Sequence, residues 1–217
     1  MIKVDKHLAV MNDGFTINTY IVTEEETGAT AVVDPSLPEE SLIEKLSGKD
    51  VQYILLTHGH FDHICGAKLV KEKTGAKIVI HKDDEIMLHD TEKNEFAINC
   101  LGLYFPEVDA DILTEDGTEL MLGNTKITVM HTPGHSMGGV CYLFVEDKVM
   151  FSGDTLFKLC AGRADLYGGN GRQELRSLVK IAELEGNYKV YPGHEEDTTL
   201  DFERENNRYI RTRFRKK

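Results

Sequence analysis

The stretch Thr57-His58-Gly59-His60-Phe61-Asp62-His63 places three histidines and one aspartate within six positions. It follows the apolar run Val51–Leu56, which predicts a buried strand. Imidazoles and a carboxylate crowded at one strand end are readily explained by a bound cation, because both groups are good ligands for zinc and similar ions. The spacing H-x-H-x-D-H also allows the first two histidines to face one ion while the aspartate and the third histidine face a second.

Three later segments repeat the arrangement of a predicted strand followed by a turn that carries one potential ligand. The turns are Thr132-Pro133-Gly134-His135-Ser136, Phe151-Ser152-Gly153-Asp154-Thr155 and Tyr191-Pro192-Gly193-His194. Glycine lets the backbone come close to an ion, and proline fixes the direction of approach. Because rigid strands present functional groups on the loops that follow them, we expect these turns to meet the first cluster at one metal site.

Strands and helices alternate along the chain, which predicts an α/β fold. The length of 217 residues fits one large domain spanning 1–217. Strands are expected at 3–10, 20–23, 30–33, 51–56, 76–80, 119–122, 126–130, 140–145, 148–151 and 190–191. A short helix is expected to begin near Ser36 and Pro38 and to end before Gly48. Further helices are expected over 67–73, 82–101, 173–184 and 200–208, with a long loop at 102–118.

Composition narrows the possible partners. The chain has 25 basic and 37 acidic residues, a net charge of −12, which argues against binding to nucleic acid backbones. No apolar run approaches the ~18 residues that span a membrane, and the N-terminus has no export signal, so we expect a cytoplasmic protein. The four cysteines are far apart and are expected to be reduced and mostly buried. The basic segment 208–217 is expected to be a solvated tail, and the oligomeric state is left open.

With its motifs in this order, the chain resembles metallo-β-lactamase-fold hydrolases. This resemblance implies an αββα sandwich of two mixed β-sheets flanked by helices, with the metals at the open edge. It implies that His58, His60 and His135 hold a first ion, that Asp62, His63 and His194 hold a second, and that Asp154 bridges both. The implied cofactors are two divalent ions, zinc foremost, with iron or manganese as alternatives. A hydroxide shared by two such ions can attack a carbonyl carbon, and Asp62 is expected to orient it.

The run Gly153-Asp154-Thr155-Leu156-Phe157, followed by Gly162-Arg163-Ala164-Asp165, resembles the glyoxalase II branch. The short segment after His194 is similar to the short bacterial members that lack the full C-terminal helical region. This resemblance implies a small-molecule substrate, an acyl-thioester such as hydroxyacylglutathione. Arg163 is expected either to bind the carboxylate of the glutathione thioester or to form a salt bridge with Asp165.

Other functions stay open to different degrees. A mono-iron persulfide dioxygenase resembles the same branch but commonly has alanine at the position of Gly193. Another metallo-β-lactamase-fold hydrolase of unassigned substrate is a further alternative. The missing export signal disfavours a β-lactamase, and the net charge disfavours an RNA-processing nuclease. A non-catalytic scaffold is disfavoured because all seven ligands are present. Phe15 and Phe157 are candidates for pocket lining or core packing.

Overall fold

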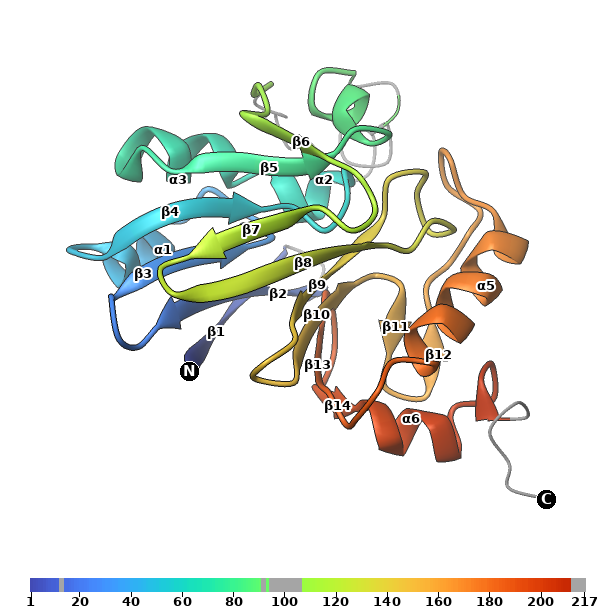
Figure 1. Cartoon of the computed structure of the whole chain (residues 1–217). Coiled ribbons are helices and arrows are strands. Elements are labelled where there is room, and N and C mark those ends of the chain that lie inside the picture. The colour runs from blue at the N-terminus through green and yellow to red at the C-terminus, as the bar shows by residue number, and fades with distance from the viewer. Residues whose placement is uncertain (12–13, 91–92, 94–106, 212–217) are drawn as a thin grey trace.

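A computed structural model of the chain describes residues 1–11, 14–90, 93 and 107–211. Two six-stranded mixed sheets pack against each other, with helices on their outer faces (Figure 1). The predicted αββα sandwich is therefore confirmed.

The first sheet, which we call the N-terminal sheet, contains six strands in chain order. They are β1 (Ile2–Val10), β2 (Thr16–Glu24), β3 (Ala29–Val33), β4 (Asp50–Leu55), β5 (Lys77–His81) and β6 (Ile112–Thr114). The pairs β1–β2 and β2–β3 are antiparallel, whereas β3 to β6 are parallel. Helices α1 (Glu40–Leu46) and α3 (Ala67–Thr74) make two of the parallel connections. The carboxyl ends of β3, β4 and β5 consequently lie at the same edge of this sheet.

The second sheet, which we call the C-terminal sheet, has the order β14-β13-β10-β9-β8-β7. Its strands are β7 (Glu119–Leu122), β8 (Thr125–His131), β9 (Val140–Phe144), β10 (Val149–Gly153), β13 (Lys189–Pro192) and β14 (Thr198–Thr199). Only β10 and β13 pair in parallel, and α5 (Gly171–Ala182) connects them. A small hairpin of β11 (Leu156–Phe157) and β12 (Cys160–Ala161) precedes α5.

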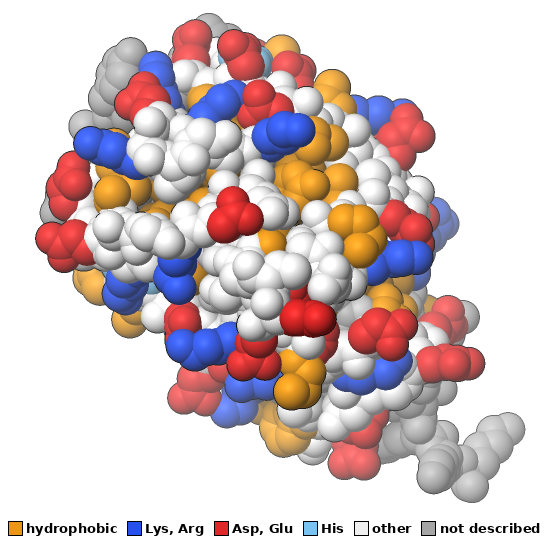
Figure 2. Space-filling model, turned by 60° about the vertical axis from the view of Figure 1, so that its left-hand side comes forward, with side chains coloured by type: hydrophobic (Ala, Val, Ile, Leu, Met, Phe, Trp, Pro, Cys, Tyr) orange, Lys and Arg blue, Asp and Glu red, His pale blue; other side chains and the backbone are white. Residues whose placement is uncertain are grey.

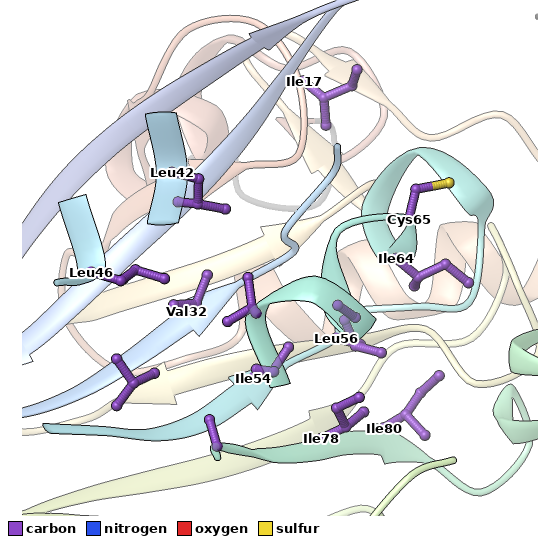
Figure 3. Packing of buried hydrophobic residues seen from close by; sticks show 14 of the residues in the cluster. Ile17, Val32, Leu42, Leu46, Ile54, Leu56, Ile64, Cys65, Ile78 and Ile80 are labelled. Carbon is purple, nitrogen blue, oxygen red and sulfur yellow. The ribbon is translucent and has the colours of Figure 1, made fainter. Parts of the chain in front are cut away.

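Three layers of buried apolar side chains hold these elements together. The layer between the sheets includes Tyr20, Val33, Tyr142 and Phe151. Figure 3 shows the layer on the outer face of the N-terminal sheet, where Leu42 and Leu46 of α1 face Val32 and where Ile64 of α2 (Phe61–Ile64) also packs. On the outer face of the C-terminal sheet, Leu178 and Ile181 of α5 pack with Leu200 of α6 (Leu200–Asn206). Each such side chain contributes about 1.5–3 kcal/mol when it is fully buried.

Local sequence explains why α5 begins where it does. The Asn170 side chain accepts hydrogen bonds from the amides of Arg172 and Gln173, which satisfies two donors of the first turn. The buried positions Leu178, Ile181 and Ala182 then follow at helical spacing. This helix therefore fixes the loop that leads into it against the C-terminal sheet.

Some predicted elements differ from the structure. Strand β2 begins at Thr16, not at residue 20, because Asn18 and Thr19 are buried polar residues that satisfy their side chains with backbone carbonyls. The predicted loop 102–118 contains β6, a three-residue strand that pairs with β5. Within the predicted helix 82–101 the structure has a 3₁₀ turn, η1 (Glu85–Leu88), and most of the rest lies outside the described residues.

The surface of the protein carries both acidic and basic side chains. Acidic and basic side chains are interspersed over the face in Figure 2, and exposed ion pairs such as Lys126–Glu119 (2.9 Å) are frequent. Among the described residues, none of the helices has the length and apolar character needed to cross a bilayer. Cys65 and Cys141 are free and buried, as expected for most of the thiols, whereas Cys160 is free and exposed; Cys100 lies outside the described residues.

Candidate metal centre

The carboxyl ends of β4, β8, β10 and β13 bring the predicted ligands together where the two sheets meet. His58 and His60 follow β4, with Asp62 and His63 on α2 directly after them. Two groups of donor atoms result, each within 4.8 Å: His58, His60 and His135 form the first group, and Asp62, His63 and His194 form the second group. These are the two groups that the family resemblance implied.

The second group has the spacing of a tetrahedral metal site. The Nε2 atom of His194 lies 3.3 Å from Nε2 of His63 and 3.4 Å from Oδ2 of Asp62. His63 Nε2 lies 3.6 Å from the same carboxylate oxygen. Donors bound to one zinc ion at ~2.0–2.1 Å in a tetrahedron lie ~3.3–3.4 Å apart. Little movement is needed for these three side chains to bind one ion.

The first group is tighter. His60 Nδ1 lies 2.8 Å from His135 Nε2, and the rings of all three histidines contact one another edge to face at centroid distances of 4.5 to 4.8 Å. The Nε2 atom of His58 is buried and has no hydrogen-bond partner.

Asp154 lies between the two groups. Its Oδ2 atom is 3.6 Å from Nε2 of His135 and 3.3 Å from Nε2 of His194. Its Oδ1 atom is 3.4 Å from Nε2 of His63. One carboxylate therefore faces donors from both groups, which is the position that a bridging ligand requires.

The outward-facing ring nitrogens are already engaged. His135 Nδ1 donates to the carbonyl of Arg163 (2.7 Å), and His194 Nδ1 donates to the carbonyl of Thr16 (2.7 Å). His63 Nδ1 donates to Oδ2 of Asp34 at 3.0 Å. When these rings are neutral, such bonds fix the tautomer and leave each Nε2 with a lone pair that faces the centre. The chain has thus pre-set the orientation of these three histidines.

A cation fits this donor set. His58 Nε2, His60 Nε2 and Asp154 Oδ1 are buried polar atoms without a hydrogen-bond partner. Burying such atoms without partners is costly, and buried polar atoms that stay unpaired call for an explanation. Two divalent ions held by these side chains would supply the missing partners of His58 and Asp154. The donors are nitrogen and carboxylate oxygen only, which suits zinc, iron or manganese.

Histidines of the first and second groups differ in the direction of their pKa shifts. Burial, together with the neighbouring imidazoles, lowers the pKa of His58 well below its usual range and lowers the pKa of His60 to about 3. Burial acts in the same direction on His194, but Asp154 and Asp62 outweigh it and raise its pKa to about 10. The same two carboxylates raise the pKa of His63. His58 and His60 are therefore neutral ligands, whereas His63 and His194 hold protons that an ion must displace.

Two buried carboxylates that support the ligand loops were not identified from the sequence. Asp34, directly after β3, accepts hydrogen bonds from the amide and hydroxyl of Thr57 at 2.8 and 2.6 Å. Asp84 accepts from the amide of Gly59 (3.0 Å), the hydroxyl of Ser136 (2.6 Å) and the amide of Gly138 (2.6 Å). Asp34 follows a strand end, the same signal that identified the ligands. Asp84 has no comparable signal.

Asp84 connects the two loops of the first group. Gly59 lies between His58 and His60, whereas Ser136 and Gly138 follow His135. Burial raises the pKa of Asp84, and the hydrogen bonds that it accepts oppose that rise. A fully buried carboxylate with three donors holds both loops at one distance from each other.

Glu174 is a further buried carboxyl group near the site. It lies on α5 beneath Gly134, and neither of its oxygens has a hydrogen bond of normal geometry. Burial raises its pKa to about 8, although the nearby amides of His135 and Gly162 lower it. The group is therefore protonated over much of the neutral range.

Three residues that the sequence analysis singled out lie at the rim of the site. The Arg163 guanidinium donates to both oxygens of Asp165, at 2.7 and 2.9 Å, so the predicted salt bridge is present. The ring of Phe15 lies 4.6 Å from that of His194, and the ring of Phe157 lies 6.1 Å from it. Phe15 is 47% exposed, which makes it a wall of the rim and not part of the core.

A further histidine pair lies outside the centre. His81 and His131, at the ends of β5 and β8, stack with centroids 4.0 Å apart and an interplanar angle of 13°. Their donor atoms come within 4.8 Å of those of Asp83. Parallel rings direct their lone pairs side by side and not toward a common point, so this arrangement does not match the geometry of the main centre.

Comparisons with known proteins agree with the site. The model of the metallo-beta-lactamase superfamily matches residues 12–194. An uncharacterized protein of Mycobacterium leprae is 35% identical over 202 residues, covering 89% of this chain and 93% of that protein. A hydroxyacylglutathione hydrolase of Rhodospirillum rubrum is 34% identical over 197 residues, covering 90% of this chain and 68% of that protein.

Two solved structures are similar along nearly the whole chain. BLEG-1 B3 metallo-beta-lactamase has a TM-score of 0.86 at 31% identity, covering 97% of this chain and 99% of that one. TTHA1623 in a di-iron-bound form has a TM-score of 0.80 at 29% identity, covering 94% and 100%. The chain belongs to the metallo-beta-lactamase superfamily. Membership of this family makes the protein a metal-dependent hydrolase, and its two groups of donors could hold metal ions.

Proposed function

We propose that the protein is a binuclear metallohydrolase that cleaves an acyl-thioester of the hydroxyacylglutathione type. The observation that carries this proposal is the position of Asp154, within 3.6 Å of His135 and 3.3 Å of His194, between two complete groups of donors. The similarity to a hydroxyacylglutathione hydrolase over 90% of the chain supports the substrate class.

The side chains divide the work of the reaction. When bound, two divalent ions supply a nucleophile from water at neutral pH and polarise the carbonyl oxygen of the substrate. His58 and His60 are neutral at that pH and present lone pairs to the centre. The Asp62 carboxylate, 3.4 Å from His194, is placed to accept a hydrogen bond from the attacking water and so to orient it. Zinc is the proposed metal; iron is the leading alternative because TTHA1623 has a di-iron-bound form.

The rim supplies contacts for both ends of such a substrate. Phe15 and Phe157 form an apolar wall beside His194 against which an acyl group can pack. Arg163, held in a fixed orientation by Asp165, provides a guanidinium for a carboxylate of the thiol part. Both contacts are part of the proposal.

A second candidate is β-lactam hydrolysis, favoured by the similarity to BLEG-1 B3 metallo-beta-lactamase over 97% of the chain. Both substrates present a carbonyl carbon to the same nucleophile. They differ in the leaving group, which is a thiolate for a thioester and an amine for a β-lactam. The metal centre alone does not separate the two reactions, so the assay must.

The test uses protein reconstituted with zinc and, separately, with iron(II) under reducing conditions. Each sample receives S-lactoylglutathione, a chromogenic cephalosporin, or glutathione persulfide with oxygen. We expect thioester hydrolysis to have the highest kcat/KM, and the Asp154→Ala variant to serve as the inactive control. Faster cephalosporin hydrolysis would establish the second candidate. Oxygen consumption with sulfite formation in the iron sample would establish a persulfide dioxygenase.

A further inference from the structure

Gly193, the residue before His194, comes very close to two neighbouring ligands. A Cβ atom placed on it would lie 2.2 Å from Oδ1 of Asp154 and 2.6 Å from Cε1 of His63. Carbon atoms that are not bonded to each other are comfortable at about 3.5–4.0 Å, so both distances are deep overlaps. These two atoms belong to the bridging carboxylate and to the second group.

The backbone at Gly193 is held on both sides. Its amide donates to the carbonyl of Gly153 at 2.9 Å, and its carbonyl accepts from the amide of Asn18 at 2.8 Å. The first bond joins β10 to the turn after β13, and the second joins that turn to β2 in the other sheet. An added methyl group would therefore displace the ligands more readily than the backbone.

The need for an unusual backbone conformation does not explain why position 193 is a glycine. Among the residues that the structure describes, ten other glycines have positive φ angles, but Gly193 is not among them. An alanine can adopt its backbone conformation without strain. What the position requires is the empty space in which the Asp154 carboxylate and the His63 ring lie.

An added methyl group at Gly193 would disturb Asp154 and the second group of ligands. Asp154 Oδ1 and His63 Cε1 are the outer ends of side chains, which can rotate away without unfolding the protein. Either movement breaks the 3.4 Å approach between His63 Nε2 and Asp154 Oδ1. The three histidines of the first group are not among the nearest neighbours of the added atom.

We infer that Gly193 is a positioning residue that determines how many ions the centre holds: the missing side chain at this position lets Asp154 and His63 complete the second metal position. The inference rests on the proposed two-ion centre. It assigns the difference between a binuclear and a mononuclear centre to one methyl group on a residue that is not itself a ligand.

The test compares Gly193→Ala with the wild type and with Gly171→Ala. Gly171 begins α5, and a Cβ atom there would meet nothing within 4 Å, so this variant is a matched glycine-to-alanine control. Each protein is stripped of metal, reloaded with cobalt(II) and desalted. Metal per chain, the visible cobalt spectrum and the circular dichroism of the stripped protein are then measured.

We expect two ions per chain in the wild type and in Gly171→Ala, and one in Gly193→Ala with an unchanged circular dichroism spectrum. The second ion should bind ~10–100-fold more weakly in Gly193→Ala, as expected when metal ligands lose their orientation. Two ions in Gly193→Ala would overturn the inference, and so would a variant that fails to fold, because the overlap would then fall on the backbone. A wild type that binds two ions without cleaving thioesters would refute the proposed function and leave the inference standing.

Discussion

The Nδ1 atom of His63 donates a hydrogen bond of 3.0 Å to Oδ2 of Asp34, a residue 29 positions earlier in the sequence. Both side chains are almost fully buried. The same carboxylate oxygen accepts from the hydroxyl of Thr57 at 2.6 Å, so a single side chain after β3 orients the end of β4 and one ring of the second group. The metal centre therefore depends on residues that do not touch a metal.

Replacing Asp154 by alanine is expected to lower kcat by more than ~10³-fold, because residues that act as a unit in catalysis lose most of their effect together. The variant removes the carboxylate that lies 3.3 Å from His194 and 3.6 Å from His135. Steady-state kinetics and metal content measured on one sample check this. Activity near that of the wild type would rule out the two-ion mechanism.

Replacing Asp84 by asparagine should weaken metal binding by the first group ~10–100-fold. The amide side chain keeps the shape but places a donor where Asp84 accepts from Gly59, Ser136 and Gly138. Competition with a chromophoric chelator measures the affinity.

Glu203→Gln is the control for that experiment. Glu203 is also fully buried and accepts hydrogen bonds from Leu159, Thr198 and Asn207, none of which is a predicted ligand. We expect this variant to lose stability but to keep its metal affinity. Equal losses of affinity in the two variants would show that Asp84 acts only through global stability.

Glu174 should make stability fall as pH rises. Burial raises its pKa from 4.5 to about 8, so between these values the folded chain binds more protons than the unfolded chain. Stability then decreases with pH through this window, by about 1.4 kcal/mol for each unit of pKa difference. Urea unfolding of the metal-free protein at about pH 5 and about pH 8.5 should show a smaller decrease for Glu174→Gln. A wild type and variant with parallel pH profiles would contradict this account.

Metal binding by the second group should release protons. Asp154 and Asp62 outweigh burial and raise the pKa of His194 to about 10, and they also raise the pKa of His63. These rings are protonated at neutral pH and must lose a proton to bind an ion, so affinity should rise with pH up to that range. Calorimetric titration in two buffers of different ionisation enthalpy detects the release. Identical heats in both buffers would contradict the prediction.

Replacing Arg163 by glutamine should raise KM for S-lactoylglutathione about tenfold with little change in kcat, because it removes binding that ground state and transition state share. A lactoyl thioester of a thiol without carboxylates should be hydrolysed by wild type and variant alike. The pair with Asp165 is exposed and contributes little to stability, so the melting temperature should hardly move. An equal change in KM for both substrates would show that Arg163 does not bind a carboxylate of the glutathione part.

The ligands could be predicted because they follow strands, and strand ends can be recognised from local hydrophobic runs. Their division into two groups was implied by the resemblance to metallo-β-lactamase-fold hydrolases. The supporting residues could not, because their importance depends on contacts between distant segments. Asp84 sits in the sequence His81-Lys82-Asp83-Asp84, where nothing distinguishes it from its exposed neighbour. Gly193 looked like a turn residue, whereas the structure shows that space for Asp154 and His63 is what it provides.

The length of a helix or strand determined whether it could be predicted from the sequence. The hairpin β11–β12 and strand β6 have two or three residues each, too few for a periodic pattern to appear. The start of β2 was obscured because Asn18 and Thr19 are buried through hydrogen bonds to backbone carbonyls and not through apolar contacts. Longer elements such as α5 and β8 were located within a few residues.

The ligands come from both sheets, and this has a consequence for how the protein unfolds. His60 and His135 are 75 residues apart in sequence, and His63 and His194 are 131 residues apart. An ion held by either pair acts as a removable cross-link that closes a long loop, and closing long loops restricts the unfolded chain. Bound ions would therefore cross-link the two sheets of the sandwich at one edge only. Loss of metal should let that edge open first, while the opposite edge, where β7 and β3 lie close together, stays closed.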